Sequence, residues 1–547
     1  MVRKGVPAVT SVARGISRRG FLGGALAAGV SGPALAGLLA ACGGGGGFSG
    51  GGGSATNAKK FKGKLVIGIN TDPPSAAQRA LAAAYRKHQP GVDIVWNVQN
   101  WGGNADGYSN WLGTQLAAGN ISLDIVSGNY QATFGKYVNL DEYETVTNPY
   151  TGNPWSKDLD WTFFVALNAA GQRIMLATQA VHISWYYNEE LFDRAKVSPP
   201  STWDELVDVC QKLQAAGITP IASNYDYMVP QWFAEVYFDQ YHVDWVKTVR
   251  ARPGDWDYVP SLDGKFHFNP DDPTIHSQYT YNVQRFFQGI QKGTLRFDTP
   301  QIQQIVANMA KVFPKYAISD LFVIEDPYPV FLQQKAAIMT DGSWTISELV
   351  NDLAQLTPAR LKTLGIPKGS VKPFKWNTFE NPTMQGSMIE SQHVRSVESA
   401  SGEYVSIISK NASQVEMAVD FVMFWLSEPG YKAYLDAYET SDEFDPAGPL
   451  EVERVSFPTK YEKLFSKLKF LGNAEANYNG FWTAGAGPSE TTDLHNLLRS
   501  ALEGSISPAQ YSGQLQQYMT SHFAEMLSLS QLTQQDVDNP ARRPTGA

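Results

Sequence analysis

The residues of this chain best suited to chemistry are aromatic rings and carboxylates that directly follow predicted strands. Three early apolar runs of strand length are each followed by a candidate contact, namely Asp72, Trp101 and Tyr130. Two further rings, Tyr227 and Trp232, come soon after a later strand. A sugar offers hydroxyls to polar side chains and apolar C–H faces to rings. These residue types are what a sugar site would need, although the rings also suit a large core.

Compact catalytic motifs are missing from the sequence. There is no H-E-x-x-H, G-x-S-x-G, Walker loop or C-x-x-C, and the eight histidines show no metal-ligand spacing. We therefore expect no enzyme activity, no cofactor and no metal. The paired carboxylates of a glycosidase have no fixed spacing, so the 53 acidic residues leave a secreted glycoside hydrolase as the alternative.

The first part of the chain alternates strands with helices. Strand-like runs at 65–69, 94–96 and 123–126 are separated by helical patterns, the first of which opens with a Ser75/Gln78 capping box. Such alternation implies an α/β fold with parallel strands and right-handed crossovers. In open sheets of this kind, ligands gather beyond the carboxyl ends of the strands, which is where Asp72, Trp101 and Tyr130 fall.

A later stretch, 181–206, predicts a strand and two helices separated by a Pro-Pro break. The second helix opens with a Thr202/Glu205 capping box, and its apolar face includes Cys210. We expect Cys210 to be a buried thiol. Since Cys42 is the only other cysteine, no structural disulfide is expected.

The sequence of residues 187–206, YNEELFDRAKVSPPSTWDEL, strongly resembles the hallmark segment of family 1 extracellular solute-binding proteins. These proteins are the receptors of ABC importers. The resemblance continues at 115–126, 217–222, 331–344 and 402–430, and it covers most of residues 62–525. It implies a two-lobed, type II periplasmic-binding-protein-like α/β fold, with two sheets flanked by helices and joined by hinge crossings.

The resemblance also implies site residues. In this family a Gly-x-Trp at a helix start faces the solute, and here Gly342-Ser343-Trp344 follows Asp341. Trp344 is then a stacking ring, Asp341 a hydroxyl acceptor and Trp482 a further ring. A tryptophan at this position can also fill the core. A core role for Trp344 predicts a large loss of stability in Trp344→Ala, whereas a platform role predicts a loss of affinity instead.

The lobe boundaries follow the resemblance. We assign 61–180 to lobe 1, 181–330 to lobe 2, 331–373 to a return into lobe 1, and 374–547 mainly to lobe 2 and the C-terminal helices. Crossings near 178–186, 327–336 and 374–382 predict a hinge. Residues 246–300 read as an irregular polar elaboration.

The amino terminus predicts export. Residues 17–22, SRRGFL, match the twin-arginine pattern, and an apolar run ends at LAAC, which resembles a lipobox. We expect residues 1–41 to be a signal peptide, Cys42 to carry a lipid, and 42–60 to be a flexible Gly/Ser-rich tether. The alternative, a retained membrane anchor, is disfavoured by the glycines and Pro33 of the run.

Charge and compartment complete the expected function. The chain has a net charge of −9, and removing residues 1–41, with five basic residues and no acidic one, makes it −14. An acidic surface argues against a nucleic-acid partner. We expect a monomeric, lipid-anchored receptor on the extracytoplasmic face of a bacterial membrane, which delivers a sugar or oligosaccharide to ABC permease subunits.

Overall fold

The computed structural model describes residues 59–69, 75–98, 105–119, 121–127, 136–161, 173–398, 404–440, 444, 446–468 and 488–544. Cys42, Asp72, Trp101, Tyr130 and Trp482 lie outside these ranges, as do the expected signal peptide and nearly all of the tether. What the sequence predicts for these residues stays a prediction. In the described part of the chain, no helix combines the length and apolar character needed to cross a membrane.

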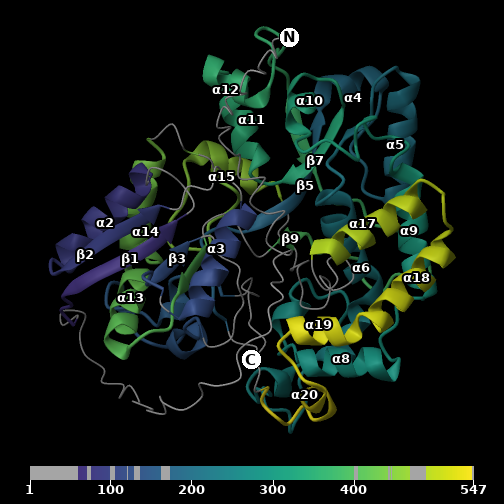
Figure 1. The fold of residues 1–547 in the computed structure, drawn as a ribbon. Helices are drawn as coiled ribbons and strands as arrows, with labels where there is room; N and C mark the ends of the chain where they lie inside the picture. Colours follow the sequence, from purple (N-terminus) through teal and green to yellow (C-terminus); the bar gives the residue numbers. More distant parts are fainter. Residues whose placement is uncertain are drawn as a thin grey trace, which may run out of the picture.

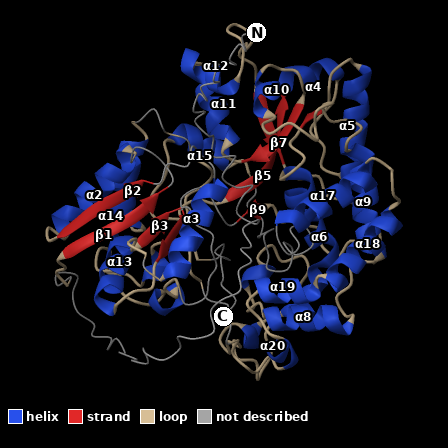
Figure 2. Ribbon diagram, viewed as in Figure 1, coloured by secondary structure: helices blue, strands red, loops and turns tan. Residues whose placement is uncertain are grey.

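Two sheets, each flanked by helices, form two lobes (Figures 1 and 2). The first sheet has the order β2-β1-β3-β10-β4. Its strands are β1 (Gly63–Ile69), β2 (Val92–Val98), β3 (Ile125–Ser127), β4 (Leu176–Ala177) and β10 (Tyr404–Ile407). As predicted, β1 is parallel to both β2 and β3, whereas β10 is antiparallel to β3. The expected α/β architecture with two sheets is confirmed.

The second sheet has the order β6-β7-β5-β8, with β9 also paired to β5. Its strands are β5 (Val181–Asn188), β6 (Ile221–Ala222), β7 (Ile338–Gly342), β8 (Trp376–Phe379) and β9 (Val397–Glu398). Successive side chains of β5 point to opposite faces. Ile183 and Trp185 therefore join one hydrophobic core, whereas Tyr186 joins the core that continues into the first lobe.

Helices cover both faces of each sheet (Figure 2). Those of the first lobe are α2 (Ala76–His88), α3 (Ala105–Ala118), α13 (Ala412–Trp425) and α14 (Glu428–Tyr438), with the 3-10 turns η1 (Leu140–Tyr143) and η2 (Trp155–Lys157). Between the lobes and around β7 lie α10 (Tyr328–Leu332), α11 (Thr345–Ala354), α12 (Pro358–Leu364) and α15 (Thr459–Phe465).

In the second lobe, α9 is the central helix, and it contacts α5, α6, α17 and α18. The helices here are α4 (Glu189–Ala195), α5 (Trp203–Ala215), α6 (Ala234–His242), α7 (Val246–Val249), α8 (Val283–Lys292), α9 (Pro300–Val312), α17 (Pro488–Leu502), α18 (Pro508–Ser521), α19 (Phe523–Leu529) and α20 (Gln534–Asp538). Shorter turns are the π-helix η3 (Met228–Phe233) and the 3-10 turns η4 (Val243–Trp245), η5 (Asp263–Lys265) and η6 (Ile275–Ser277).

Two helix starts predicted from capping residues three positions apart are confirmed. Ser75 and Thr202 each cap a helix through a reciprocal capping box, with Gln78 and Glu205 respectively. Cys210 is a free, buried thiol as expected, and burial raises its pKa. The helix α13 begins at Ala412. Its cap is Asn411, whose side chain accepts a hydrogen bond from the amide of Gln414 at 3.1 Å.

The expected return of 331–373 into the first lobe is wrong for its strand. β7 pairs antiparallel with β5 and parallel with β6, so it belongs to the second sheet. The segment that returns to the first sheet is β10, followed by α13 and α14, and it had been assigned mainly to the second lobe. The lobe assignment of these segments is wrong because the local sequence pattern of a strand does not determine which strand it pairs with.

Two of the three expected crossings are also wrong. Residues 327–336 and 374–382 lead into β7 and β8, which lie side by side with β5 in one sheet. The crossing near 178–186 is confirmed, because residues 178–180 join β4 of the first sheet to β5 of the second. Residues 446–453, which we call the strap, run antiparallel to the crossing at residues 178–180.

Residues 246–300 are more ordered than the sequence suggested. They contain α7 and α8, and a fully buried ion network fixes them to α6. Asp239 contacts His276 at 2.6 Å and Arg395 at 2.8 Å, and the Arg395 guanidinium donates to the carbonyls of Pro270 and Asp272 at 2.7 and 2.6 Å.

Candidate functional site

Four of the predicted site residues are described, and the structure brings them together at the end of β7. The rings of Trp344 and Trp232 lie edge to face with centroids 5.6 Å apart, and those of Trp232 and Tyr227 with centroids 5.5 Å apart. The hydroxyl of Tyr227 donates to Asp341 Oδ1 at 3.3 Å. A carboxylate and three rings from β7 and the loop after β6 therefore form one group, which we call the aromatic cluster.

Asp341 is held from several sides. It lies on β7 opposite Ser184 of β5, it is fully buried, and its Oδ1 accepts the backbone amide of Gly342 at 2.9 Å. The carbonyl of Gly342 accepts a hydrogen bond from the Tyr186 hydroxyl at 2.7 Å. The end of β7 is thereby fixed before the chain turns into α11.

The indole of Trp344 folds back over Gly342. A Cβ built on Gly342 would lie 2.3 Å from a carbon of that ring, so this close approach requires glycine. Trp344 is 3% exposed and packs in the core of the second lobe. Its Nε1 is buried without a hydrogen-bond partner among the described residues. The side chain is thus a core residue in the structure, whatever further role it has.

Tyr227 and Trp232 are positioned by an unusual turn. After β6 the chain enters the π-helix η3, and the Trp232 amide donates to the Tyr227 carbonyl at 3.0 Å. The Tyr227 amide in turn donates to the Asn224 side chain at 3.2 Å, and Asn224 donates to the carbonyls of Ile324 and Glu325 at 2.7 and 2.8 Å. Such π-bulges are frequent at functional sites.

A cavity of about 260 Å³ opens beside this turn. Its walls come from the loop after β6, the loop at 320–325 and one face of α17, namely Tyr225, Asp226, Phe322, Thr492, His495, Asn496 and Arg499. The α17 residues are spaced three or four apart, so they share one face of the helix. Sequence reasoning missed this face, although the spacing was visible.

The cavity wall combines apolar rings with polar groups. The rings of Tyr225 and Phe322 lie edge to face at 4.9 Å, and the Arg499 guanidinium lies 4.0 Å from the Phe322 centroid. Burial, and then the charge of Glu325, raise the pKa of Asp226. Burial lowers the pKa of His495 to about 4, so it is neutral at pH 7. This wall offers ring faces, hydrogen-bond donors and acceptors to a polar solute.

One serine–histidine pair has the spacing of a nucleophile and its base, but it is closed off. His182 Nε2 lies 2.8 Å from Ser396 Oγ, and its Nδ1 lies 2.9 Å from Ser184 Oγ. All three residues are buried, and none of them lines the cavity. Among the described residues, no group of three or more His, Cys, Asp or Glu is placed to hold a metal ion.

Comparisons with known proteins show what this chain is similar to. A family model described as bacterial extracellular solute-binding protein matches residues 68–432. The structure of a family 1 extracellular solute-binding protein from Bifidobacterium longum subsp. infantis is 13% identical, covers 84% of this chain and 99% of its own, and has a TM-score of 0.52. At such identity the likeness shows the fold alone.

Two further solved structures have the same fold. The apo form of RafE from Streptococcus pneumoniae is 13% identical over 87% of this chain and 100% of its own, with a TM-score of 0.53. The cyclic alpha-maltosyl-1,6-maltose binding protein from Arthrobacter globiformis is 13% identical over 85% of this chain and 99% of its own, with a TM-score of 0.52.

Proposed function

Since the chain belongs to the bacterial extracellular solute-binding proteins, we propose that it binds a sugar or oligosaccharide between its lobes and delivers it to an ABC importer. The observation that carries this proposal is the aromatic cluster at the end of β7. Three rings and a carboxylate converge there. Rings that stack on C–H faces, together with groups that pair with hydroxyls, are what sugar recognition needs.

The relatives support the same solute class. The Arthrobacter protein is by its name a cyclic alpha-maltosyl-1,6-maltose binding protein. In our proposal Trp344, Trp232 and Tyr227 provide rings, and Asp341 accepts hydroxyls. Asp72, Trp101 and Tyr130 of the first lobe and Trp482 complete the site.

The proposed cellular setting is a lipid-anchored receptor. Membership in an extracellular family implies an extracytoplasmic location. The sequence pattern at 17–22 supports export by the twin-arginine route, and LAAC at 39–42 supports lipidation of Cys42. The receptor then works as a monomer held to the membrane by its lipid and tether.

Calorimetric titration with a panel of neutral mono- and oligosaccharides, combined with chromatography of the sugars afterwards, tests the proposal. We expect saturable binding of at least one sugar, recovery of that sugar unchanged, and a higher melting temperature of the complex, because a ligand that binds the native state stabilises it. Binding of no sugar in the panel would contradict the proposed solute class. Cleaved sugar would favour the alternative, a glycoside hydrolase.

A further inference from the structure

Ser343 lies between the two residues that shape the aromatic cluster, Gly342 and Trp344, and its hydroxyl joins two separate segments. Ser343 Oγ accepts a hydrogen bond from the backbone amide of His182 at 3.0 Å and donates to the carbonyl of Ala447 at 2.5 Å. His182 follows the crossing at 178–180, and Ala447 belongs to the strap. One buried hydroxyl therefore ties the crossing and the strap to the end of β7.

The strap is fixed to α11 by a row of side chains. Ser343, Ser347 and Asn351 are spaced four apart, so they lie on one face of the helix and its start. Ser347 Oγ donates to the Pro446 carbonyl at 2.8 Å, and Asn351 Nδ2 donates to the Phe444 carbonyl at 3.1 Å. These bonds hold the first part of the strap, and Phe444 just before it, against α11.

The last part of the strap is bonded to segments of the first lobe instead. The Glu451 amide donates to the Thr178 carbonyl at 2.9 Å, and the Asp160 amide donates to the Glu451 carbonyl at 2.7 Å. The Glu453 amide donates to the Asp158 carbonyl at 2.8 Å. The strap is therefore bonded to the start and one face of α11 in its first part and to segments of the first lobe in its last part.

We propose that Ser343 is a positioning residue that transmits the position of the strap to the ring of Trp344, and so sets solute affinity without touching the solute. This inference rests on the proposed function only for its affinity readout. The physical route is short: Ala447 bonds to Ser343, the neighbouring Trp344 ring lies against Gly342, and Gly342 is fixed by Asp341 and Tyr186. The Ser343 hydroxyl is the group in this route to change, because it makes two hydrogen bonds, one with the His182 amide and one with the Ala447 carbonyl.

The test compares Ser343→Ala with Ser347→Ala. Each change removes one buried hydroxyl that donates to a strap carbonyl, but Ser347 lies one helical turn further from Trp344. We expect a larger loss of melting temperature in Ser343→Ala, which removes the donor to the Ala447 carbonyl and the acceptor of the His182 amide, than in Ser347→Ala, which removes only the donor to the Pro446 carbonyl. Affinity for the sugar found by calorimetry should fall about three- to tenfold in Ser343→Ala, the size of one hydrogen bond, and stay unchanged in Ser347→Ala.

A second readout needs no solute. In protein labelled with 5-fluorotryptophan, the fluorine resonance of Trp344 is the one that disappears in Trp344→Phe. We expect this resonance to shift in Ser343→Ala and to stay in place in Ser347→Ala. If Ser343→Ala does not fold, Gln179→Met replaces it, because Gln179 Oε1 accepts the Ala447 amide at 2.6 Å and its loss also releases the strap.

The outcomes separate the two proposals. Binding of no sugar together with the expected fluorine shifts would overturn the proposed function and leave Ser343 as a positioning residue. Equal effects of Ser343→Ala and Ser347→Ala on affinity and on the resonance would show that both serines merely stabilise the fold, and would overturn the inference. An unmoved Trp344 resonance in Ser343→Ala would do the same.

Discussion

The backbone of Gly448 lies directly against the carbonyl oxygen of Ala180. A Cβ built on Gly448 would stand 1.8 Å from that oxygen and 3.0 Å from Ser343 Oγ. Ala180 ends the crossing from β4 to β5, and Gly448 lies in the strap, so the two segments pack tightly against each other here. Only a residue without a side chain fits there.

Gly448→Ala is therefore expected to push the strap away from the crossing. We expect a lower melting temperature and a changed radius of gyration without solute, measured by small-angle scattering. Wild-type protein should become more compact on saturation with its sugar, as hinge closure requires. Gly513→Ala is the matched control, because a Cβ there meets nothing within 4 Å, and alanine in a helix is slightly stabilising. A Gly448→Ala protein with wild-type stability and radius would contradict the role of this contact.

Gly342→Ala tests the placement of the Trp344 ring. Trp344→Ala cannot separate a core role from a ligand role, because the ring is buried and its removal costs about 3–5 kcal/mol in either case. Gly342→Ala keeps the tryptophan but places a methyl where the ring lies, 2.3 Å from its nearest carbon. We expect solute affinity to fall about ten- to a hundredfold. Unchanged affinity by calorimetry would remove Trp344 from the site.

Features set by neighbours in sequence were predictable. The capping boxes at Ser75 and Thr202 depend on residues three apart, and the strand runs of β1 and β5 on a few consecutive residues. The loop rings Tyr227 and Trp232 were found because they follow a strand, and they do lie beside Trp344.

Features that depend on distant partners were not predictable from one sequence. β7 resembles any short buried strand, and its neighbour β5 lies about 150 residues earlier, so nothing local assigned it to the second sheet. Asp239 likewise looks like an ordinary helix residue, yet its partners His276 and Arg395 are 37 and 156 residues away. The cavity needed three segments to be brought together, and only its α17 face was visible in the sequence.

Acid should destabilise the protein partly through Asp239. Burial alone would raise its pKa, but Arg395 and His276 lower the pKa of Asp239 to about 2. The folded pKa lies below the unfolded value of about 3.9, so its contribution is present above pH 4 and is lost as the pH falls from 4 to 2. The shift corresponds to about 2–3 kcal/mol.

Asp239→Asn should remove this contribution and leave Arg395 buried without its counter-charge. We expect a loss of about 3–5 kcal/mol at pH 7 in urea unfolding, and a shallower decline of stability between pH 4 and pH 2. Asp208→Asn is the control, because its pair with Lys212 is exposed and contributes little. Equal effects of the two substitutions would contradict the importance of the buried network.

Membrane attachment should depend on Cys42. Replacing Cys42 with Ala removes the only atom to which the proposed lipid can be attached, so we expect a folded protein that leaves the membrane fraction. Cys210→Ala is the matched control, since Cys210 is the other cysteine of the chain and is buried. Fractionation of cells that express each variant measures this. If the Cys42→Ala protein stays with the membrane as firmly as wild type, the lipoprotein proposal is wrong.

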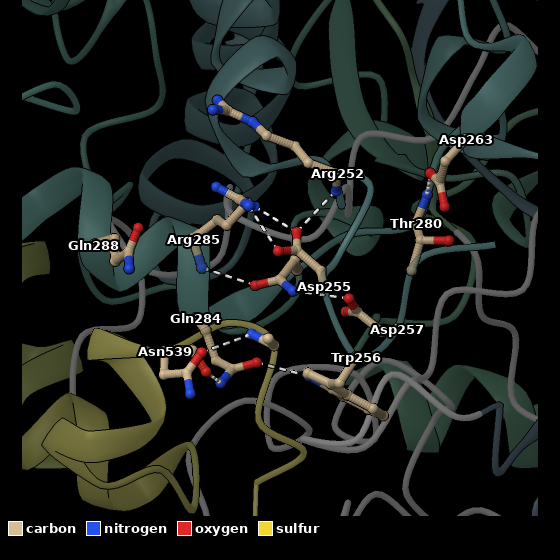
Figure 3. A network of polar contacts seen from close by, with 12 residues as sticks. Arg252, Asp255, Trp256, Asp257, Asp263, Thr280, Gln284, Arg285, Gln288 and Asn539 are labelled. Atoms are coloured by element: carbon tan, nitrogen blue, oxygen red, sulfur yellow. Dashed lines mark hydrogen bonds and ion pairs between the residues drawn. The ribbon is translucent and has the colours of Figure 1, made fainter. Parts of the chain in front are cut away.

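Asp257→Asn should stabilise the protein at neutral pH, because burial makes the charged form of this carboxylate unfavourable. Asp257 lies in a polar network with Asp255 (Figure 3). Burial, reinforced by Asp255 and Asp263, raises the pKa of Asp257 to about 6, although the Asn282 amide, which donates to it at 2.8 Å, acts in the opposite sense. A folded pKa above the unfolded value of about 3.9 means that stability is lost as the pH rises from 4 to 6. Asparagine keeps the acceptor for Asn282 without the charge, so urea unfolding should show an unfolding free energy higher by about 1–3 kcal/mol at pH 7.5 and almost unchanged at pH 4.

The control is Asp255→Asn, which breaks the pair with Arg285 and should instead destabilise the protein at both pH values. A gain at pH 4 equal to that at pH 7.5 would show that the charge of Asp257 is not its cause.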